Sequence, residues 1–199
     1  MSAIKQRTNK ECRKTRETDI SIDLNLDGSG NADVNTGIGF FDHMLISFLT
    51  HGRFDGVIKV SGDTHVDFHH SVEDTGIVLG KAICGSLKNK VGIKRFGSSF
   101  VPMDESLVLA SVDISGRPFL VFDCEFPTQK VGDMDTELFI EFFRAFAFNA
   151  GITLHIKLFH GSNSHHIAEA IFKAVARAIK EACTIDVNSN EILSTKGIL

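Results

Sequence analysis

Two stretches of this chain begin with a pair of adjacent histidines, and together they decide its fold. Residues 69–83 read HHSVEDTGIVLGKAI, and residues 165–179 read HHIAEAIFKAVARAI. When the two are aligned at a constant offset of 96 residues (165 minus 69), His, His, Glu, Ala and Ile coincide. Similarity at a fixed offset indicates an internal duplication. We therefore expect two similar halves, residues 1–93 and residues 94–199, each containing one of these stretches.

The segments around these stretches show the hydrophobic patterns of strands and helices. Residues 20–26 alternate between apolar and polar side chains, which is typical of a half-buried strand, and a turn follows. Asp42 is expected to cap a helix over residues 43–49. The other expected elements are strands at 54–60, 106–114, 119–126 and 152–159 and helices at about 69–87, 136–150 and 165–182. This order predicts an α+β fold of two halves, each a small β-sheet with helices on one face.

The paired histidines are suited to holding metal ions. On a helix, His69 and His70 point in different directions, and Glu73 follows three or four positions further on. The second stretch repeats this arrangement, and a further histidine lies upstream of each pair. The candidate ligands are His43, His69, His70, Glu73, His155, His165, His166 and Glu169. Divided evenly, they supply two sites of three histidines and one glutamate, and an octahedral ion would keep about two open positions for substrate.

A structural interpretation of these histidines competes with metal binding. A single His-His pair at the start of a helix is usually a polar cap or solvated surface. Two copies at the same point of a repeat are hard to explain by packing, because histidine is a poor choice for a core face. His51, His65 and His160 fit no such pattern and are interpreted as loop or helix-end residues. The duplicated pairs therefore favour metal sites.

The composition limits the kinds of partner and of metal ion that we expect. A formal net charge of -4 argues against binding to a nucleic-acid backbone. The sequence contains no run of about 18 apolar residues, so no membrane span is predicted. The cysteines are too scattered for a CxxC motif, and we interpret them as reduced thiols of a cytoplasmic protein. A zinc site often uses thiolates in a closed set of four ligands, so Mn²⁺ fits the histidine-rich set better.

Three motifs resemble the imidazoleglycerol-phosphate dehydratase family. They are GIGFFDHML at residues 37–45, DFHHSVED at 67–74 and SNSHHIAEA at 162–170. The resemblance extends from about Arg16 to Gly197. Ile46 and Ser47 depart from it, because many relatives carry Asp-Gln there. The length leaves no room for the phosphatase domain of bifunctional relatives, so a monofunctional form is expected.

The resemblance implies a fold, an assembly and a reaction. The fold would be like the second domain of ribosomal protein S5, assembled into a hollow shell of twenty-four subunits with active sites between them. Each active site would hold two Mn²⁺ ions and remove water from imidazoleglycerol phosphate to give imidazole acetol phosphate, in histidine biosynthesis. Ions bound to the substrate's ring nitrogens would favour imidazolate, whose electrons expel hydroxide from the neighbouring carbon.

The resemblance also assigns residues to the substrate. Glu17 is the candidate acid/base, with Glu73 and Glu169 as metal-binding carboxylates of the catalytic centre. Guanidinium and ammonium groups suit a phosphate dianion. The candidate phosphate ligands are Arg95, Arg117, Ser194 and Lys196.

Other functions remain open from the residues alone. A binuclear metallohydrolase acting on a phosphorylated small molecule would also use two ions, since bridged ions activate water. Non-enzymatic alternatives are an RNA-binding module, which the negative charge disfavours, and a metal-storage shell, which has no need of phosphate-binding residues.

Overall fold

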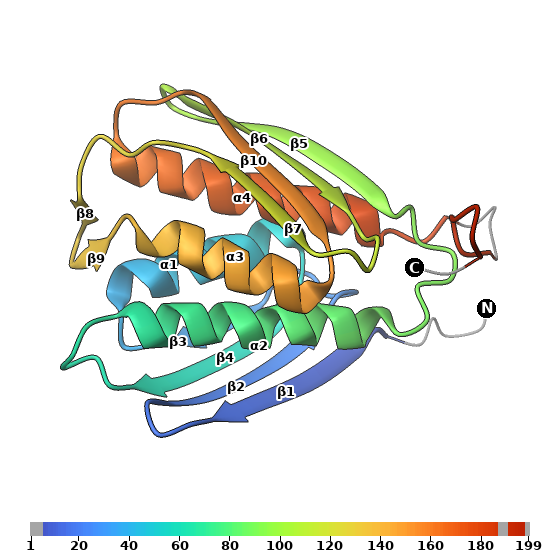
Figure 1. Ribbon diagram of the computed structural model, residues 1–199, viewed down its shortest axis with the longest axis horizontal. Helices are drawn as coiled ribbons and strands as arrows, with labels where there is room; N and C mark the ends of the chain where they lie inside the picture. The colour runs from blue at the N-terminus through green and yellow to red at the C-terminus, as the bar shows by residue number, and fades with distance from the viewer. Residues whose placement is uncertain (1–5, 187–190, 198–199) are drawn as a thin grey trace.

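The computed structural model describes residues 6–186 and 191–197 and consists of two sheets with helices between them. Figure 1 shows the sheets as the two outer layers and the four helices as the filling. None of the helices in the described ranges has the length and apolar character needed to cross a membrane.

The two halves of the chain follow the same order of elements. The first half contains β1 (Thr8–Lys14), β2 (Thr18–Asn25), β3 (Ala32–Asn35), α1 (Gly39–Gly52), β4 (Asp55–Gly62) and α2 (His69–Leu87). The second half contains β5 (Phe96–Met103), β6 (Ser106–Asp113), β7 (Phe119–Asp123), the short β8 (Lys130–Val131) and β9 (Met134–Asp135), α3 (Leu138–Ala150), β10 (Thr153–His160) and α4 (Ser164–Cys183). Only the hairpin β8–β9 lacks a described counterpart in the first half.

The sheets repeat each other in topology as well as in order. One has the strand order β1-β2-β4-β3 and the other β5-β6-β10-β7. In both, the last pair is parallel (β3 with β4, β7 with β10) and the other pairs are antiparallel. The expected α+β fold of two sheets, each with helices on one face, is confirmed.

The core lies between the sheets, where the two halves pack on each other. Strand β2 buries every second side chain under the helices, and β6 does the same. Helix α2 packs along α3, and α1 packs along α4. Phenylalanines fill this layer, with Phe142, Phe143 and Phe172 in mutual ring contact at centroid distances of 4.9 to 5.4 Å. Each helix pair therefore combines one helix from each half.

The start of α1 differs from the expectation. The helix begins at Gly39, so the prediction that Asp42 precedes it as an N-cap is wrong. Asp42 lies in the first turn, and its carboxylate accepts hydrogen bonds from the backbone N–H and the hydroxyl of Thr36 at 2.7 and 2.6 Å. The carboxylate thus ties the preceding loop to the helix, and His43 follows in the second turn.

Strands β1 and β5 were not predicted because their sequences lack the usual signal. The side chains of β1, TNKECRK, are half-buried or exposed, as expected of an edge strand with no apolar face. Strand β5, FGSSFVPM, contains a glycine and a proline, which are depleted in strands but tolerated at an edge. Both strands are fixed by pairing with a neighbour rather than by local preference.

Helices α2 and α3 approach each other through glycines. A Cβ atom on Gly80 would lie 2.5 Å from the carbonyl oxygen of Phe146 and 2.8 Å from the backbone nitrogen of Ala150. A Cβ on Gly76 would lie 2.6 Å from the carbonyl oxygen of Phe142. These contacts are with backbone atoms, which cannot rotate out of the way. The separation of the two helices therefore depends on these glycines.

We expect Gly80→Ala to lower the free energy of unfolding by about 1–3 kcal/mol, because an added methyl group overpacks the helix contact. The better helix propensity of alanine, up to about 1 kcal/mol, offsets only part of this loss. Thermal unfolding followed by circular dichroism measures the change. Gly39→Ala is the matched control, since nothing lies within 4 Å of its Cβ position. Equal unfolding temperatures for Gly80→Ala and the unmodified chain would disprove the close contact.

Candidate functional site

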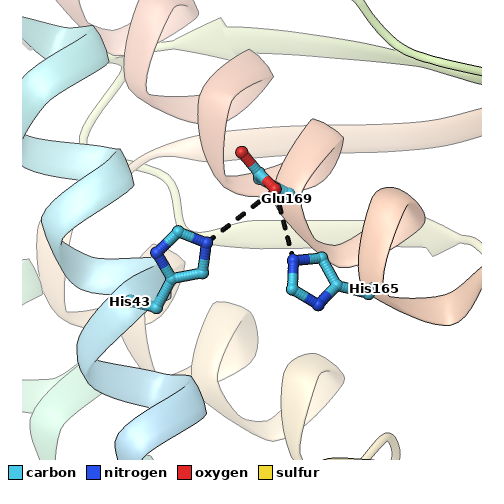
Figure 2. A group of neighbouring side chains, drawn as sticks. All are labelled: His43, His165 and Glu169. Carbon is cyan, nitrogen blue, oxygen red and sulfur yellow. Dashed lines mark ion pairs between the residues drawn. The ribbon is translucent and has the colours of Figure 1, made fainter.

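A cluster of three side chains that could hold a metal ion lies where α1 meets the start of α4. His43 comes from α1, and His165 and Glu169 come from α4 (Figure 2). Glu169 Oε2 lies 3.4 Å from His165 Nε2 and 3.8 Å from His43 Nε2. The three ligand atoms all lie within 4.8 Å of one another. We call this group the α1–α4 cluster; it takes residues from both halves of the chain.

Local structure fixes the geometry of the α1–α4 cluster. The side chain of Asn163 accepts hydrogen bonds from the backbone N–H groups of His165 and His166 and so caps α4. With the helix start fixed, His165 and Glu169, four positions apart, share one face. The ring of Phe40 packs edge-on against His165 at a centroid distance of 5.1 Å and against His43 at 6.4 Å.

The charge of Glu169 is stabilised by its neighbours. Burial acts to raise the pKa of this carboxyl, but a 2.6 Å hydrogen bond from Lys173 Nζ to Oε1 and the positive charge of Lys173 outweigh it. His43 and His165 act in the same direction, so the pKa lies below its ordinary value. Glu169 is therefore ionised at neutral pH, with Oε2 turned toward the two imidazoles.

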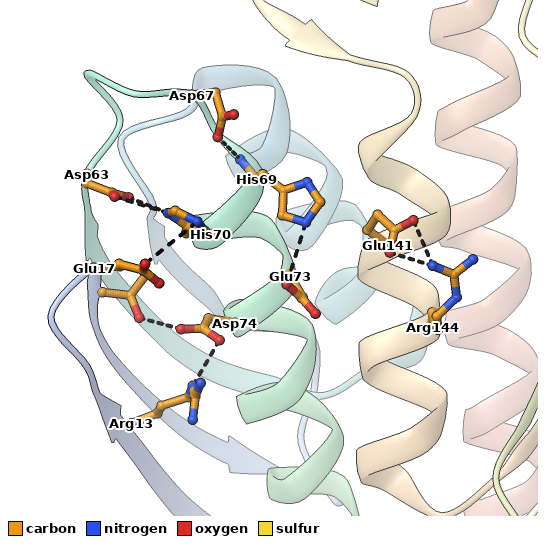
Figure 3. A network of polar contacts seen from close by, with 11 residues as sticks. Arg13, Glu17, Asp63, Asp67, His69, His70, Glu73, Asp74, Glu141 and Arg144 are labelled. Atoms are coloured by element: carbon orange, nitrogen blue, oxygen red, sulfur yellow. Dashed lines mark hydrogen bonds and ion pairs between the residues drawn. The ribbon is translucent and has the colours of Figure 1, made fainter.

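A second group gathers where α2 meets α3. His69 Nε2 lies 3.6 Å from Glu73 Oε2, again four positions apart on one helix. A shift of 98 residues (141 minus 43) superposes the buried positions of α1 from Phe41 to Gly52 on the buried positions of α3 from Phe139 to Ala150. The same shift places Glu141 where α1 has His43. Figure 3 shows Glu141 on α3, facing the start of α2 and joined to Arg144.

The contact between α2 and α3 supports this placement. Gly76 of α2 lies against Phe142, and Gly80, one turn on, lies against Phe146, so the two helices run parallel. Glu73 lies one turn before Gly76, next to the part of α3 that carries Glu141. We call His69, Glu73 and Glu141 the α2–α3 group. Glu141 was not among the sequence candidates, because its equivalence to His43 follows only from the burial pattern of the two helices.

His155 does not join either group within one chain. It lies on β10 between the buried Leu154 and Ile156, so its exposed side chain is on the face of the sheet opposite the helices. The assignment of His155 as the second upstream histidine rested on residue type, and it stays a prediction; in the fold, the position equivalent to His43 is Glu141.

His70 and His166 are each held by a carboxylate: Asp63, just after β4, holds His70, and Glu105, at the β5–β6 turn, holds His166. His70 Nδ1 lies 3.0 Å from Asp63 Oδ2, and its Nε2 lies 3.9 Å from Glu17 Oε1 (Figure 3). His166 Nδ1 lies 2.7 Å from Glu105 Oε2. Figure 3 shows His69 and His70 pointing in different directions, as expected.

These contacts shift the pKa values of the two histidines. The hydrogen bond with Asp63 raises the pKa of His70, and that with Glu105 raises the pKa of His166. In return, His166 and the backbone N–H groups of Ser162 and Asn163 hold the pKa of Glu105 well below its usual range. Glu105 precedes β6 as Glu17 precedes β2, an offset of 88 (105 minus 17), and this equivalence was the signal by which Glu105 could have been found.

The four candidate phosphate ligands gather around Asp113 and the C-terminal segment. Arg95 Nε donates to Asp113 Oδ1 at 2.7 Å, and its Nη1 donates to the carbonyl oxygen of Leu193 at the same distance. Arg117 Nη2 lies 3.6 Å from Asp113 Oδ2. Arg95 and Ser194 line a cavity of about 440 Å³. Lys196 follows, with its backbone N–H donating to the Ser194 hydroxyl.

The candidate metal ligands and the candidate phosphate ligands lie at opposite ends of the folded molecule. Figure 1 shows α2 and α4 starting at one end of the molecule, whereas the start of β5 and the C-terminal segment lie at the other. Helix α4 has 20 residues and so spans roughly 30 Å between them. A small phosphorylated substrate cannot reach both within one chain.

Comparisons with known proteins show the family of this chain. A family model described as imidazoleglycerol-phosphate dehydratase matches residues 36–179. The imidazoleglycerol-phosphate dehydratase of Acetivibrio thermocellus is 58% identical, covering 94% of this chain and 96% of that protein. That of Clostridium novyi is also 58% identical, covering 96% of this chain and all of that protein.

Solved structures of similar proteins have the same fold. The Staphylococcus aureus imidazoleglycerol-phosphate dehydratase superposes with a TM-score of 0.81 at 42% identity, covering 90% of this chain and 99% of that one. The Pyrococcus furiosus structure gives a TM-score of 0.81 at 34% identity, covering 95% and 100%. The chain therefore belongs to the imidazoleglycerol-phosphate dehydratase family.

Proposed function

We propose that this dehydratase converts imidazoleglycerol phosphate to imidazole acetol phosphate at active sites formed between subunits, each with two Mn²⁺ ions. The observation that carries the proposal is the separation of the metal-binding groups from the candidate phosphate ligands within one chain. Because one substrate needs both, residues from two copies must combine. The closed shell of twenty-four subunits that the family resemblance implies would meet this need, in a cytoplasmic enzyme whose four cysteines are unpaired.

The α1–α4 cluster fits a metal ion. Two atoms bound to one ion at about 2.1 Å are at most about 4.2 Å apart. The separations of 3.4 and 3.8 Å from Glu169 Oε2 to the two imidazoles lie within this limit. Two neutral nitrogens and a carboxylate oxygen are also the donors that a divalent manganese ion accepts. Lys173 occupies the other oxygen, so that Oε2 is the one left for the ion.

The α2–α3 group is proposed to hold the second ion through His69, Glu73 and Glu141. His70 and His166 point away from the groups on their own helices and are proposed to complete the ligand sets of neighbouring copies. Asp63 and Glu105 would fix the orientation of these imidazoles, as carboxylates do for metal-binding histidines in general. When bound, the ions supply positive charge that stabilises the negative charge developing on the substrate's imidazole ring.

The chain's own side chains are proposed to bind the substrate and move its protons. Arg117 is the more exposed of the two arginines and presents its guanidinium to the phosphate dianion, while Arg95 is oriented by Asp113. Glu17, exposed at the hairpin turn beside His70, is proposed to take the proton from the substrate carbon. The neighbouring carbon loses its hydroxyl group, which leaves as water, and the resulting enol becomes the ketone.

Glu169→Gln keeps the shape of the side chain and removes its charge. We expect at least a tenfold loss of kcat and a loss of bound manganese, because the ion loses its only anionic donor in the α1–α4 cluster. Elemental analysis and a ketone-formation assay measure both effects. The control is Asp23→Asn, an exposed carboxylate on β2, which should change neither value. A Glu169→Gln enzyme with full manganese and full activity would rule out this ligand.

Substitutions at Glu141 and His155 show which of these two residues binds the second metal ion. If Glu141 binds the second ion, Glu141→Ala lowers the manganese content and kcat, whereas Glu141→His, which places an imidazole as in α1, retains most of both. His155→Ala then leaves the manganese content unchanged. The opposite pattern, with metal lost only in His155→Ala, would restore His155 and exclude Glu141.

A further inference from the structure

The turn that carries Glu17 is joined to helix α2 through a buried carboxylate, that of Asp74. Asp74 is 7% exposed, and its Oδ2 accepts a hydrogen bond from the hydroxyl of Thr18 at 2.5 Å. Its Oδ1 accepts a hydrogen bond from Arg13 Nε at 2.9 Å (Figure 3). Arg13 lies on β1 and Thr18 on β2, on the two sides of the turn. The carboxylate therefore ties both strands of the hairpin to the helix that carries His70.

Hydrogen bonds close this turn and leave the carboxylate of Glu17 open. The hydroxyl of Thr15 accepts hydrogen bonds from the backbone N–H groups of Glu17 and Thr18 at 3.0 and 2.9 Å and lies 3.2 Å from the Thr18 hydroxyl. The carbonyl oxygen of Glu17 accepts one from the backbone N–H of Asp63 at 3.1 Å. Within residues 6–186 and 191–197, the Glu17 carboxylate accepts no hydrogen bond and lies 3.9 Å from His70 Nε2. The backbone is thus fixed, while the side chain stays open to a substrate.

The equivalent carboxylate of the second half is bound to its own chain. Glu105 corresponds to Glu17 at the offset of 88. Its Oε1 accepts hydrogen bonds from the backbone N–H groups of Ser162 and Asn163, and its Oε2 lies 2.7 Å from His166 Nδ1. Both oxygens of Glu105 are therefore occupied. Of the two turn carboxylates, Glu17 is the one available for proton transfer.

The second half also shows that the fold does not need the buried ion pair. Val101 takes the place of Arg13 at the hairpin offset of 88 (101 minus 13), and Ala170 takes the place of Asp74 at the helix offset of 96 (170 minus 74). Both replacements are buried. Burying a charged pair costs free energy that apolar residues avoid. The pair is present only beside the open carboxylate, which points to a role for the pair at Glu17.

We infer that Asp74 is a positioning residue for the proposed acid/base, Glu17. The inference rests on the proposed function, which assigns the proton transfer to Glu17. Through Arg13 and Thr18, Asp74 holds the turn at a fixed distance from the helix that carries His70. The acid/base and the candidate metal ligands of α2 then keep the relative placement that the reaction needs. Because Asp74 is buried, it acts through Glu17 rather than on the substrate.

Substitutions in the folded, full-length enzyme test this role. Thr18→Val removes the hydroxyl group and keeps the shape of the side chain, and Asp74→Asn removes the charge that Arg13 pairs with. We expect each to lower kcat by about tenfold to a hundredfold, because a small displacement of an acid/base slows proton transfer. KM and bound manganese should stay unchanged. A ketone-formation assay and elemental analysis measure these values.

Two further variants serve as matched controls. Thr18→Ser keeps the hydroxyl group and should retain most of kcat. Ser86→Ala removes another buried hydroxyl group, which donates to the carbonyl oxygen of Ala82 at 2.8 Å further along α2, and should leave kcat unchanged. Circular dichroism verifies folding, and Thr18→Val carries the test if Asp74→Asn does not fold.

The decisive measurement repeats Thr18→Val and Asp74→Asn in a Glu17→Gln background. A residue that acts only through Glu17 causes no further loss once that carboxylate is gone. We therefore expect the double variants to have the residual kcat of Glu17→Gln alone. A residue with a merely structural role would lower kcat by the same factor in both backgrounds.

The possible failures can be told apart. Full kcat in Thr18→Val and Asp74→Asn, an equal further loss in the Glu17→Gln background, or a loss of manganese in step with kcat would each overturn the inference. In these cases an impaired Glu17→Gln enzyme still supports Glu17 as the acid/base. A fully active Glu17→Gln enzyme would remove that assignment and the inference together.

Discussion

The packing of one helix from each half against a helix of the other half is the constraint on which the rest of the structure depends. Because α1 lies along α4, the α1–α4 cluster takes side chains from both halves, and α2 packs along α3 in the same way. Glycines in α2 allow the backbone of α3 to approach closely, and a layer of phenylalanines fills the space between the helices. Neither half alone contains all three residues of the α1–α4 cluster.

The two halves differ in the outer faces of their sheets and in the candidate site residues that they carry. The first sheet keeps a polar outer face and carries Glu17 at a hairpin turn, whereas the second sheet has an apolar outer face and carries Arg95 and Arg117 at its far end. Lys173 holds Glu169 in one cluster, but the equivalent position in α2, at an offset of 96 (173 minus 77), is Ile77. The two proposed ion positions are therefore equivalent in the repeated fold but differ in their surroundings.

Much of this organisation was readable from the sequence because the repeated histidine stretches place chemistry and fold on the same residues. Hydrophobic periodicity predicted the helices α2 and α4, and residue type pointed to His43 as a candidate ligand. Glu141 and Glu105 did not, since a single acidic residue has no local signature and its role comes from packing between distant segments. Strand β1 was missed for a similar reason: it has no apolar face of its own, and pairing with β2 alone makes it a strand.

We propose that one active site combines the candidate metal ligands of one subunit with the candidate phosphate ligands of another. The most direct test co-expresses two impaired variants, Glu169→Gln and Arg117→Ala, with different affinity tags. Only assemblies that carry both tags are purified and assayed. In hybrid assemblies with random mixing, about a quarter of the sites receive an intact Glu169 from one copy and an intact Arg117 from the other. At low substrate concentration, we expect the hybrids to have about a quarter of the activity of the unmodified enzyme. Hybrids no more active than the two parent variants would contradict it.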